Sequence, residues 1–168
     1  QRNRKPGRSS PPRVALIIET STSFGRTMLC GIAAWIRENT PWSVYFGERS
    51  VYDPVPRWLR HWEGDGIITR TPSPEIRSIV AGSRIPVVDL NEQLGGMGVP
   101  LISIDHAAVG RMAAEHLLER GFTSFAYVGH PGLSWSDWRG RSFTETVGSA
   151  GYSCAHYPGE AEDVSLLR

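Results

Sequence analysis

Residues 14–25 read Val-Ala-Leu-Ile-Ile-Glu-Thr-Ser-Thr-Ser-Phe-Gly, and this stretch decides the fold class. Its first part, Val14–Ile18, is a continuous apolar run of the length of one strand. Strands that are covered by helices on both faces carry such runs, because neither face meets water. The hydroxyl-rich segment 19–25 that follows predicts a loop at the carboxyl end of this first strand.

Helical and strand patterns alternate along the rest of the chain. Apolar residues recur at helical spacing through 25–38, and Pro41 ends that helix because the residue before a proline leaves the helical region. Asp105 predicts an N-cap and Gly121 a helix end. The sequence predicts further strands at 43–46, 66–69, 85–90, 101–104, 125–128 and 153–157, and further helices at 56–62, 74–81, 105–121, 138–149 and from 161. This order predicts an α/β fold with a doubly wound parallel sheet.

Composition narrows the class of protein. The 168 residues carry 18 basic and 17 acidic side chains, a formal net charge of +1, whereas nucleic-acid-binding domains show a basic excess or stripe. The one basic cluster, within residues 1–12, predicts a disordered tail. No apolar run approaches the roughly 18 residues of a membrane span, so we expect no membrane partner. Cys30 and Cys154 suggest buried thiols in a reducing cytoplasm rather than a disulfide.

Several catalytic and cofactor motifs are missing from the sequence. It has no G-x-G-x-x-G, no P-loop and no G-x-S-x-G, and its Cys and His residues lack metal-ligand spacing. Glu19 at the first strand end is a candidate metal ligand, but the third strand ends in Thr69-Arg70, which offers no second carboxylate. The sequence therefore predicts no cofactor, no metal and no catalytic residues.

The strand-end loops instead suit a polyol ligand. In doubly wound sheets ligands bind beyond the carboxyl ends of the strands. A sugar needs hydrogen-bonding groups and an aromatic face, which a tryptophan and a fork of guanidinium donors provide. The predicted ligand-binding residues are Phe24, Arg26, Asp89, Asn91, Trp135 and Arg139. Core packing of Trp138 and a structural ion pair of Arg139 remain open as alternatives.

One long stretch of the sequence matches the pattern of a known protein family, and it begins at Asp105-His106. It continues through Ala114-Glu115-His116-Leu117-Leu118 and Gly121-Phe122 to the strand Phe125–Val128 and Gly129. With residues 14–26, Gly64–Ile68 and Ile85–Val88, and with Arg139 before Phe143, it resembles the sensor domain of LacI/GalR-type regulators. Within that periplasmic-binding-protein-like superfamily it is most similar to the xylose-operon regulator branch.

This resemblance implies a type I periplasmic-binding-protein-like fold in which two α/β subdomains close on a sugar or similar effector. It implies a first subdomain at 13–104 and part of a second at 105–168. The family's effector contacts carry over to Phe24, Asn91, Trp135 and Arg139, and less clearly to Arg26. A homodimer, a pentose-like effector and a cytoplasmic location follow as expectations.

Three departures from the family pattern stand out. His106 follows Asp105 where Asn is usual, and Ser142 replaces a frequent Gly before Phe143. The chain shows no helix-turn-helix, so we expect DNA contact only through an arabinose-regulator-type domain outside it. The alternatives are a soluble sugar-binding transport protein of the same fold and a small doubly wound enzyme.

Overall fold

The computed structural model describes residues 10–50, 53–70, 73–91 and 98–159. The chain divides into two compact units, residues 1–103 and 104–168. Most of the predicted basic tail and all of the helix predicted from residue 161 lie outside the described residues.

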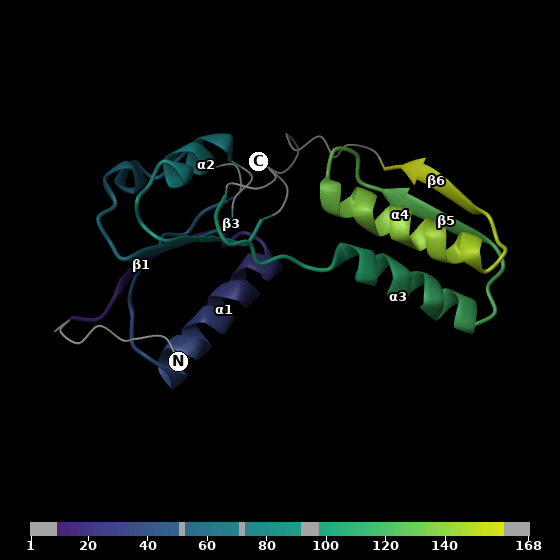
Figure 1. Ribbon diagram of the computed structural model, residues 1–168, viewed down its shortest axis with the longest axis horizontal. Coiled ribbons are helices and arrows are strands. Elements are labelled where there is room, and N and C mark those ends of the chain that lie inside the picture. The colour runs from purple at the N-terminus through teal and green to yellow at the C-terminus, as the bar shows by residue number, and fades with distance from the viewer. Residues whose placement is uncertain (1–9, 51–52, 71–72, 92–97, 160–168) are drawn as a thin grey trace. The chain divides into compact units, whose positions relative to one another are not determined.

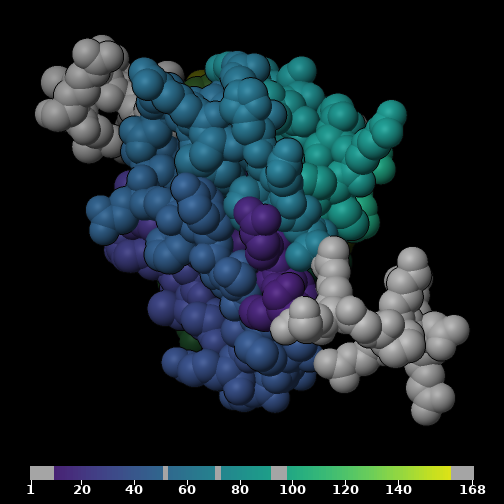
Figure 2. Space-filling model, turned by 90° about the vertical axis from the view of Figure 1, so that its left-hand side faces the viewer, coloured from purple at the N-terminus to yellow at the C-terminus, as the bar shows by residue number. Residues whose placement is uncertain are grey.

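The first unit contains a parallel sheet of four strands in the order β2-β1-β3-β4. The strands are β1 (Arg13–Ile18), β2 (Ser43–Tyr45), β3 (Gly66–Arg70) and β4 (Val87–Asp89). β1 pairs with β2 on one side and with β3 on the other. In Figure 2 the purple start of β1 emerges between blue segments on both sides. Val14–Ile18 is buried throughout, which confirms the prediction of a central strand covered on both faces.

Helices lie on both faces of this sheet, and Figure 1 shows α1 (Ser23–Glu38) and α2 (Pro74–Ala81) on opposite sides of it. α2 begins at Pro74, and its N-cap is Ser73, whose hydroxyl accepts from the amide of Ile76. A short 3₁₀ helix, η1 (Arg57–His61), precedes β3. The core is formed by side chains from the strands, η1 and α2: Ala15, Ile17, Leu59, Ile67, Ile76, Val80 and Val87.

The apolar stripe of α1 is less buried than its periodicity predicts. Gly25 is the one buried residue of this helix, whereas Met28, Leu29, Ile32 and Ile36 are half-buried. The prediction of a buried thiol is wrong for Cys30, which is exposed. Helical periodicity identified the helix, but the burial of one face depends on what packs against it.

The second unit pairs β5 (Phe125–Gly129) with β6 (Cys154–Pro158) in parallel. Helices α3 (His106–Glu119) and α4 (Ser134–Ser149) pack extensively against each other, and α4 contacts both strands. Ala114, Phe125, Phe143 and Val147 form the core. Among the described residues of the chain, no helix combines the length and apolarity that a bilayer crossing requires.

Both predicted ends of α3 are confirmed. The Asp105 carboxylate accepts from the amide of Ala108 at 2.8 Å, which satisfies a free donor of the first turn. Gly121 adopts a φ of 77°, a left-handed conformation that a side chain disfavours. The amides of Gly121 and Phe122 then donate to the carbonyls of Leu118 and Leu117, which closes the helix.

Two predictions of secondary structure need correction. Residues 101–104 do not form a strand, because β4 ends at Asp89 and leaves only a single bridge between Asp89 and Leu101. α4 begins at Ser134 rather than at 138, so Trp135 lies in its first turn. Leu133 occupies the N-cap position without a capping side chain, and the sequence signal for the start of a helix was therefore absent.

A substitution at Gly110 tests how much the close packing of α3 against α4 contributes to the stability of the fold. A Cβ at Gly110 would lie 2.2 Å from the carbonyl oxygen of Arg139, whereas a Cβ at Gly148 in α4 would meet nothing within 4 Å. We expect Gly110→Ala to lower the free energy of unfolding by about 1–3 kcal/mol. Gly148→Ala is the control, and it should be neutral or raise stability by up to about 1 kcal/mol. Calorimetric unfolding measures both, and equal melting temperatures would contradict the tight crossing.

Candidate functional site

Polar side chains of the first unit gather at the carboxyl end of its sheet. Glu19 follows β1 directly, and its side chain is only 1% exposed. Its carboxylate forms an ion pair with Arg70 and accepts from the hydroxyl of Thr22 at 3.1 Å. The Arg70 guanidinium lies 4.8 Å from the ring centroid of Phe24. We call these four residues, Glu19, Thr22, Phe24 and Arg70, the Glu19 cluster.

Local sequence explains how the Glu19 cluster forms. Thr22 is the N-cap of α1, and its hydroxyl accepts from the amide of Gly25 at 3.1 Å while it donates to Glu19. A Cβ at Gly25 would lie 2.0 Å from the carbonyl oxygen of Glu19, so only glycine permits this approach of helix to strand end. Phe24 lies in the first turn of α1, and this arrangement leaves it at the surface, where it is 43% exposed.

The other predicted ligand residues of this unit differ in how they are held. Arg26 is exposed, and its guanidinium donates to the carbonyl of Thr20 at 2.7 Å, which holds the loop. Asp89 is buried at the end of β4 and its carboxylate accepts from the amide of Asn91 at 3.1 Å. In the sheet register Asp89 pairs with Thr69 and Thr69 with Ile17, so these residues lie in one row across three strands.

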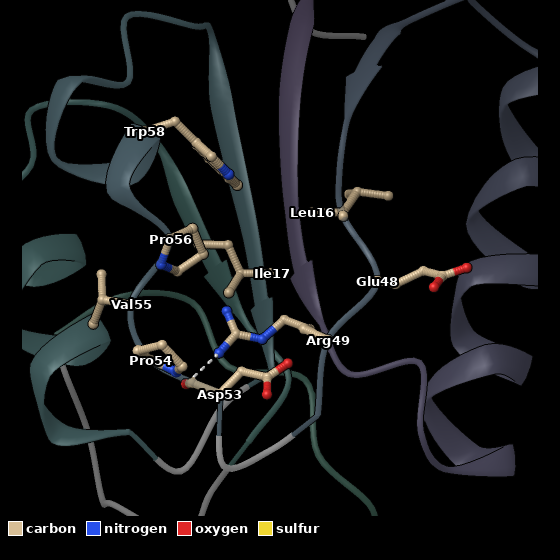
Figure 3. A pocket seen from close by; sticks show the side chains of 10 residues that line it. Leu16, Ile17, Glu48, Arg49, Asp53, Pro54, Val55, Pro56 and Trp58 are labelled. Atoms are coloured by element: carbon tan, nitrogen blue, oxygen red, sulfur yellow. Dashed lines mark hydrogen bonds between the residues drawn. The ribbon is translucent and has the colours of Figure 1, made fainter.

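A cavity of about 310 Å³ lies beside β1 in the same unit, and Figure 3 shows the Arg49 side chain pointing into it. Arg49 donates to the carbonyl of Asp53 at 3.3 Å, and its own backbone pairs with Thr20. Burial lowers the pKa of the Arg49 guanidinium, and the carboxylates of Asp53 and Glu19 oppose that shift. Leu16, Ile17, Trp58 and the segment 53–56 supply most of the remaining wall.

The second unit has its own cluster at the start of α4. The Arg139 guanidinium lies 4.9 Å from the ring centroid of Trp135, and its Nε donates to Nδ1 of His106 at 3.1 Å. The imidazole of His106 stacks on Trp138 with centroids 5.9 Å apart. We call His106, Trp135, Trp138 and Arg139 the Arg139 cluster. An indole face beside a guanidinium is the pairing that the sequence suggested for a polyol.

The structure decides between the alternatives left open for two of these residues. Trp138 is 46% exposed and is therefore not a core residue. Arg139 bonds to a histidine ring and an indole face, and no ion pair of Arg139 is found within the described ranges.

Two buried polar residues, Ser136 and Glu19, have partners that give them a structural part. The hydroxyl oxygen of Ser136, which is 1% exposed, accepts from the backbone amide of His130 at 2.7 Å, so it holds the loop after β5. Glu19 lies against a guanidinium instead of a second carboxylate. Within the described part of the chain, no three His, Cys, Asp or Glu side chains gather as metal ligands.

Sequence reasoning missed Arg49, Arg70 and the part played by His106. Arg70 ends β3, and the rule that ligands bind at strand ends would have marked it. Arg49 and His106 carry no such signal, because they reach their partners from segments that are remote in sequence.

Comparison with known proteins identifies the family. Residues 13–96, half of the chain, match the family model described as XylR N-terminal domain, and residues 114–166 match that of a periplasmic binding protein-like domain. The chain belongs to the XylR N-terminal domain family. The resemblance to xylose-operon regulators that the motifs suggested is thus confirmed.

Individual relatives agree with this assignment. The xylose operon regulatory protein of Escherichia coli K12 is 26% identical over 157 residues, which are 88% of this chain and 39% of that protein. The chain therefore spans about two fifths of the length of the curated relatives it matches.

Solved structures show the fold. The structure of the xylose-binding transcription activator XylR matches with a TM-score of 0.74 and 22% identity, over 94% of this chain and 42% of that one. A periplasmic binding protein/LacI regulator from Alkaliphilus metalliredigens, complexed with D-xylulofuranose, matches with a TM-score of 0.66 and 17% identity, over 94% and 60%. The predicted parallel α/β fold of periplasmic-binding-protein-like type I is confirmed.

The Glu19–Arg70 pair gives a stability test with an internal control. Arg70→Met would leave the buried Glu19 carboxylate with Thr22 and the more distant Arg49, and we expect it to cost about 2–4 kcal/mol. The matched change is Arg60→Met, since Arg60 pairs with Glu75 where both side chains are more than half exposed. That change should cost less than about 1 kcal/mol. Urea unfolding measures both, and similar costs would show that Glu19 is not held by Arg70.

Proposed function

We propose that this chain is the sugar-sensing part of a transcription regulator and that its effector is a pentose. The observation that carries the proposal is the Arg139 guanidinium over the Trp135 ring in a chain of the XylR family. A planar donor group next to an indole face can bind sugar hydroxyls and the apolar side of a pyranose ring together. The relatives' names, a xylose operon regulator and a complex with D-xylulofuranose, support the pentose.

Four residues of the first unit are further ligand contacts in this proposal. Phe24 offers a further aromatic ring, which is exposed and contacts the guanidinium of Arg70. Asp89 and Asn91 offer a carboxylate and an amide at the end of β4. Arg26 holds the loop through the carbonyl of Thr20, and we assign it the weaker part in binding.

The rest of the regulator's action is also part of the proposal. We propose that the protein acts in the cytoplasm as a homodimer, that it catalyses no reaction, and that DNA is bound by a module outside this chain. The effector would act by population shift, because a ligand that binds one conformation more tightly favours that conformation. A sugar-binding transport protein has the same fold, but the regulator relatives favour sensing.

A screen of sugars by thermal shift tests the pentose. In the protein at its full natural length we expect one pentose to raise the melting temperature by several degrees. Saturation at a hundred times Kd adds about 2.7 kcal/mol to the stability of the folded state. Hexoses serve as the comparison, since they share the hydroxyl chemistry but not the size. If no pentose stabilises the protein, the proposal that its effector is a pentose is refuted.

Variants at the Arg139 cluster test the site. We expect Trp135→Ala and Arg139→Ala each to weaken binding of the stabilising pentose by at least about tenfold, because each removes a group that contacts the sugar. Trp35→Ala is the control, since Trp35 lies on α1, is 48% exposed and contacts Trp42. Isothermal titration calorimetry gives the Kd values. Unchanged binding by both cluster variants would refute the assignment of this site.

A further inference from the structure

His106 is a buried histidine at an otherwise accessible helix start. It is the first residue of α3, and only 5% of its surface is exposed, whereas Ala107 beside it is exposed. Its Nδ1 lies 3.1 Å from Nε of Arg139. The arginine Nε always carries hydrogen, so Nδ1 must be the acceptor, and the neutral ring then carries its proton on Nε2.

The contact is imposed by the crossing of α3 and α4. Gly110 brings the backbones together at Arg139, where a Cβ would lie 2.2 Å from the arginine carbonyl oxygen. One turn away, the Ser142 hydroxyl donates to the carbonyl of Ala107 at 2.7 Å. These two contacts fix the helices at positions adjacent to both partners. His106 and Arg139 therefore meet with little freedom on either backbone.

Two further contacts hold the ring and the guanidinium. Trp138 stacks on the imidazole with an interplanar angle of 29°, which fixes the plane of the ring. The guanidinium carbon lies over Trp135 at 4.9 Å. Nε of Arg139 is thus held by Nδ1 of His106, and the guanidinium is held by the indole ring of Trp135. A long side chain that would otherwise sample many rotamers is restricted to one presentation of its donors.

We propose that His106 is a positioning residue for effector binding, acting through Nδ1 to orient the guanidinium of Arg139. This inference rests on the proposed function, because it assigns Arg139 to the sugar. An asparagine side chain at this position would carry Oδ1 on the same branch as Nδ1 of histidine. An acceptor at that atom, rather than an imidazole as such, is what the position requires.

Two substitutions separate the acceptor from the ring. His106→Asn keeps an acceptor at the δ position and loses the stack on Trp138. His106→Phe keeps an aromatic ring for the stack and removes the acceptor. In the protein at its full natural length we expect His106→Asn to bind D-xylose within about threefold of the wild type. We expect His106→Phe to bind at least about tenfold more weakly, because the charged donor loses its partner.

The results with these two variants test the role of His106 separately from the proposed binding of a sugar. Circular dichroism and melting temperatures establish that both variants fold. Wild-type affinity in His106→Phe would overturn the inference, and so would equal losses in both variants, since packing alone would then explain them. Failure of the wild type to bind D-xylose or any other pentose would refute the proposed function and, with it, a role of His106 toward sugar.

The contact itself is open to a measurement that needs no ligand. Nitrogen-15 NMR of the histidine side chains should show His106 as the Nε2–H tautomer, with the Arg139 Nε–H resonance shifted in His106→Phe and less shifted in His106→Asn. A protonated Nδ1 in the neutral ring would overturn the inference even if D-xylose binds. If His106 is the Nε2–H tautomer but the protein binds no sugar, the contact with Arg139 is supported and the proposed function is refuted.

Discussion

A buried carboxylate organises the carboxyl end of the sheet in the first unit. Glu19 is almost completely removed from water, and the desolvation of a charge costs several kcal/mol unless partners compensate it. The compensation comes from Arg70 at the end of β3 and from the hydroxyl of Thr22. That same hydroxyl caps α1, and Arg70 supports the ring of Phe24. The start of a helix, the end of a strand and an exposed aromatic are therefore fixed by a single charge.

In the second unit the side chains of the Arg139 cluster are positioned by the packing of two helices and not by a buried carboxylate. Here the backbone of α3 meets that of α4 at Gly110, and the side chains around the crossing take their positions from it. The guanidinium of Arg139 contacts the imidazole of His106 and the indole of Trp135.

The sequence predicted most elements because their signals were local. The apolar run of β1, the proline at the start of α2 and the capping by Asp105 each depend on a few neighbouring residues. The predictions failed where the signal was missing or was set elsewhere. α4 begins without a capping side chain at Leu133, and residues 101–104 have no strand left to pair with.

The sequence alone determined the fold class, through the order and periodicity of its elements, and the residue types at the strand ends that suit a polyol. The family followed from the similarity of the sequence to known proteins. Only the tertiary structure decided what those residues do. It showed that Arg26 bonds to its own loop, that Trp138 stacks on His106, and that Arg139 lies over Trp135. The partners of Glu19 and Arg139 come from segments up to 51 residues away. A long-range contact depends on how strands and helices pack, and the spacing of residues along the chain does not encode it locally.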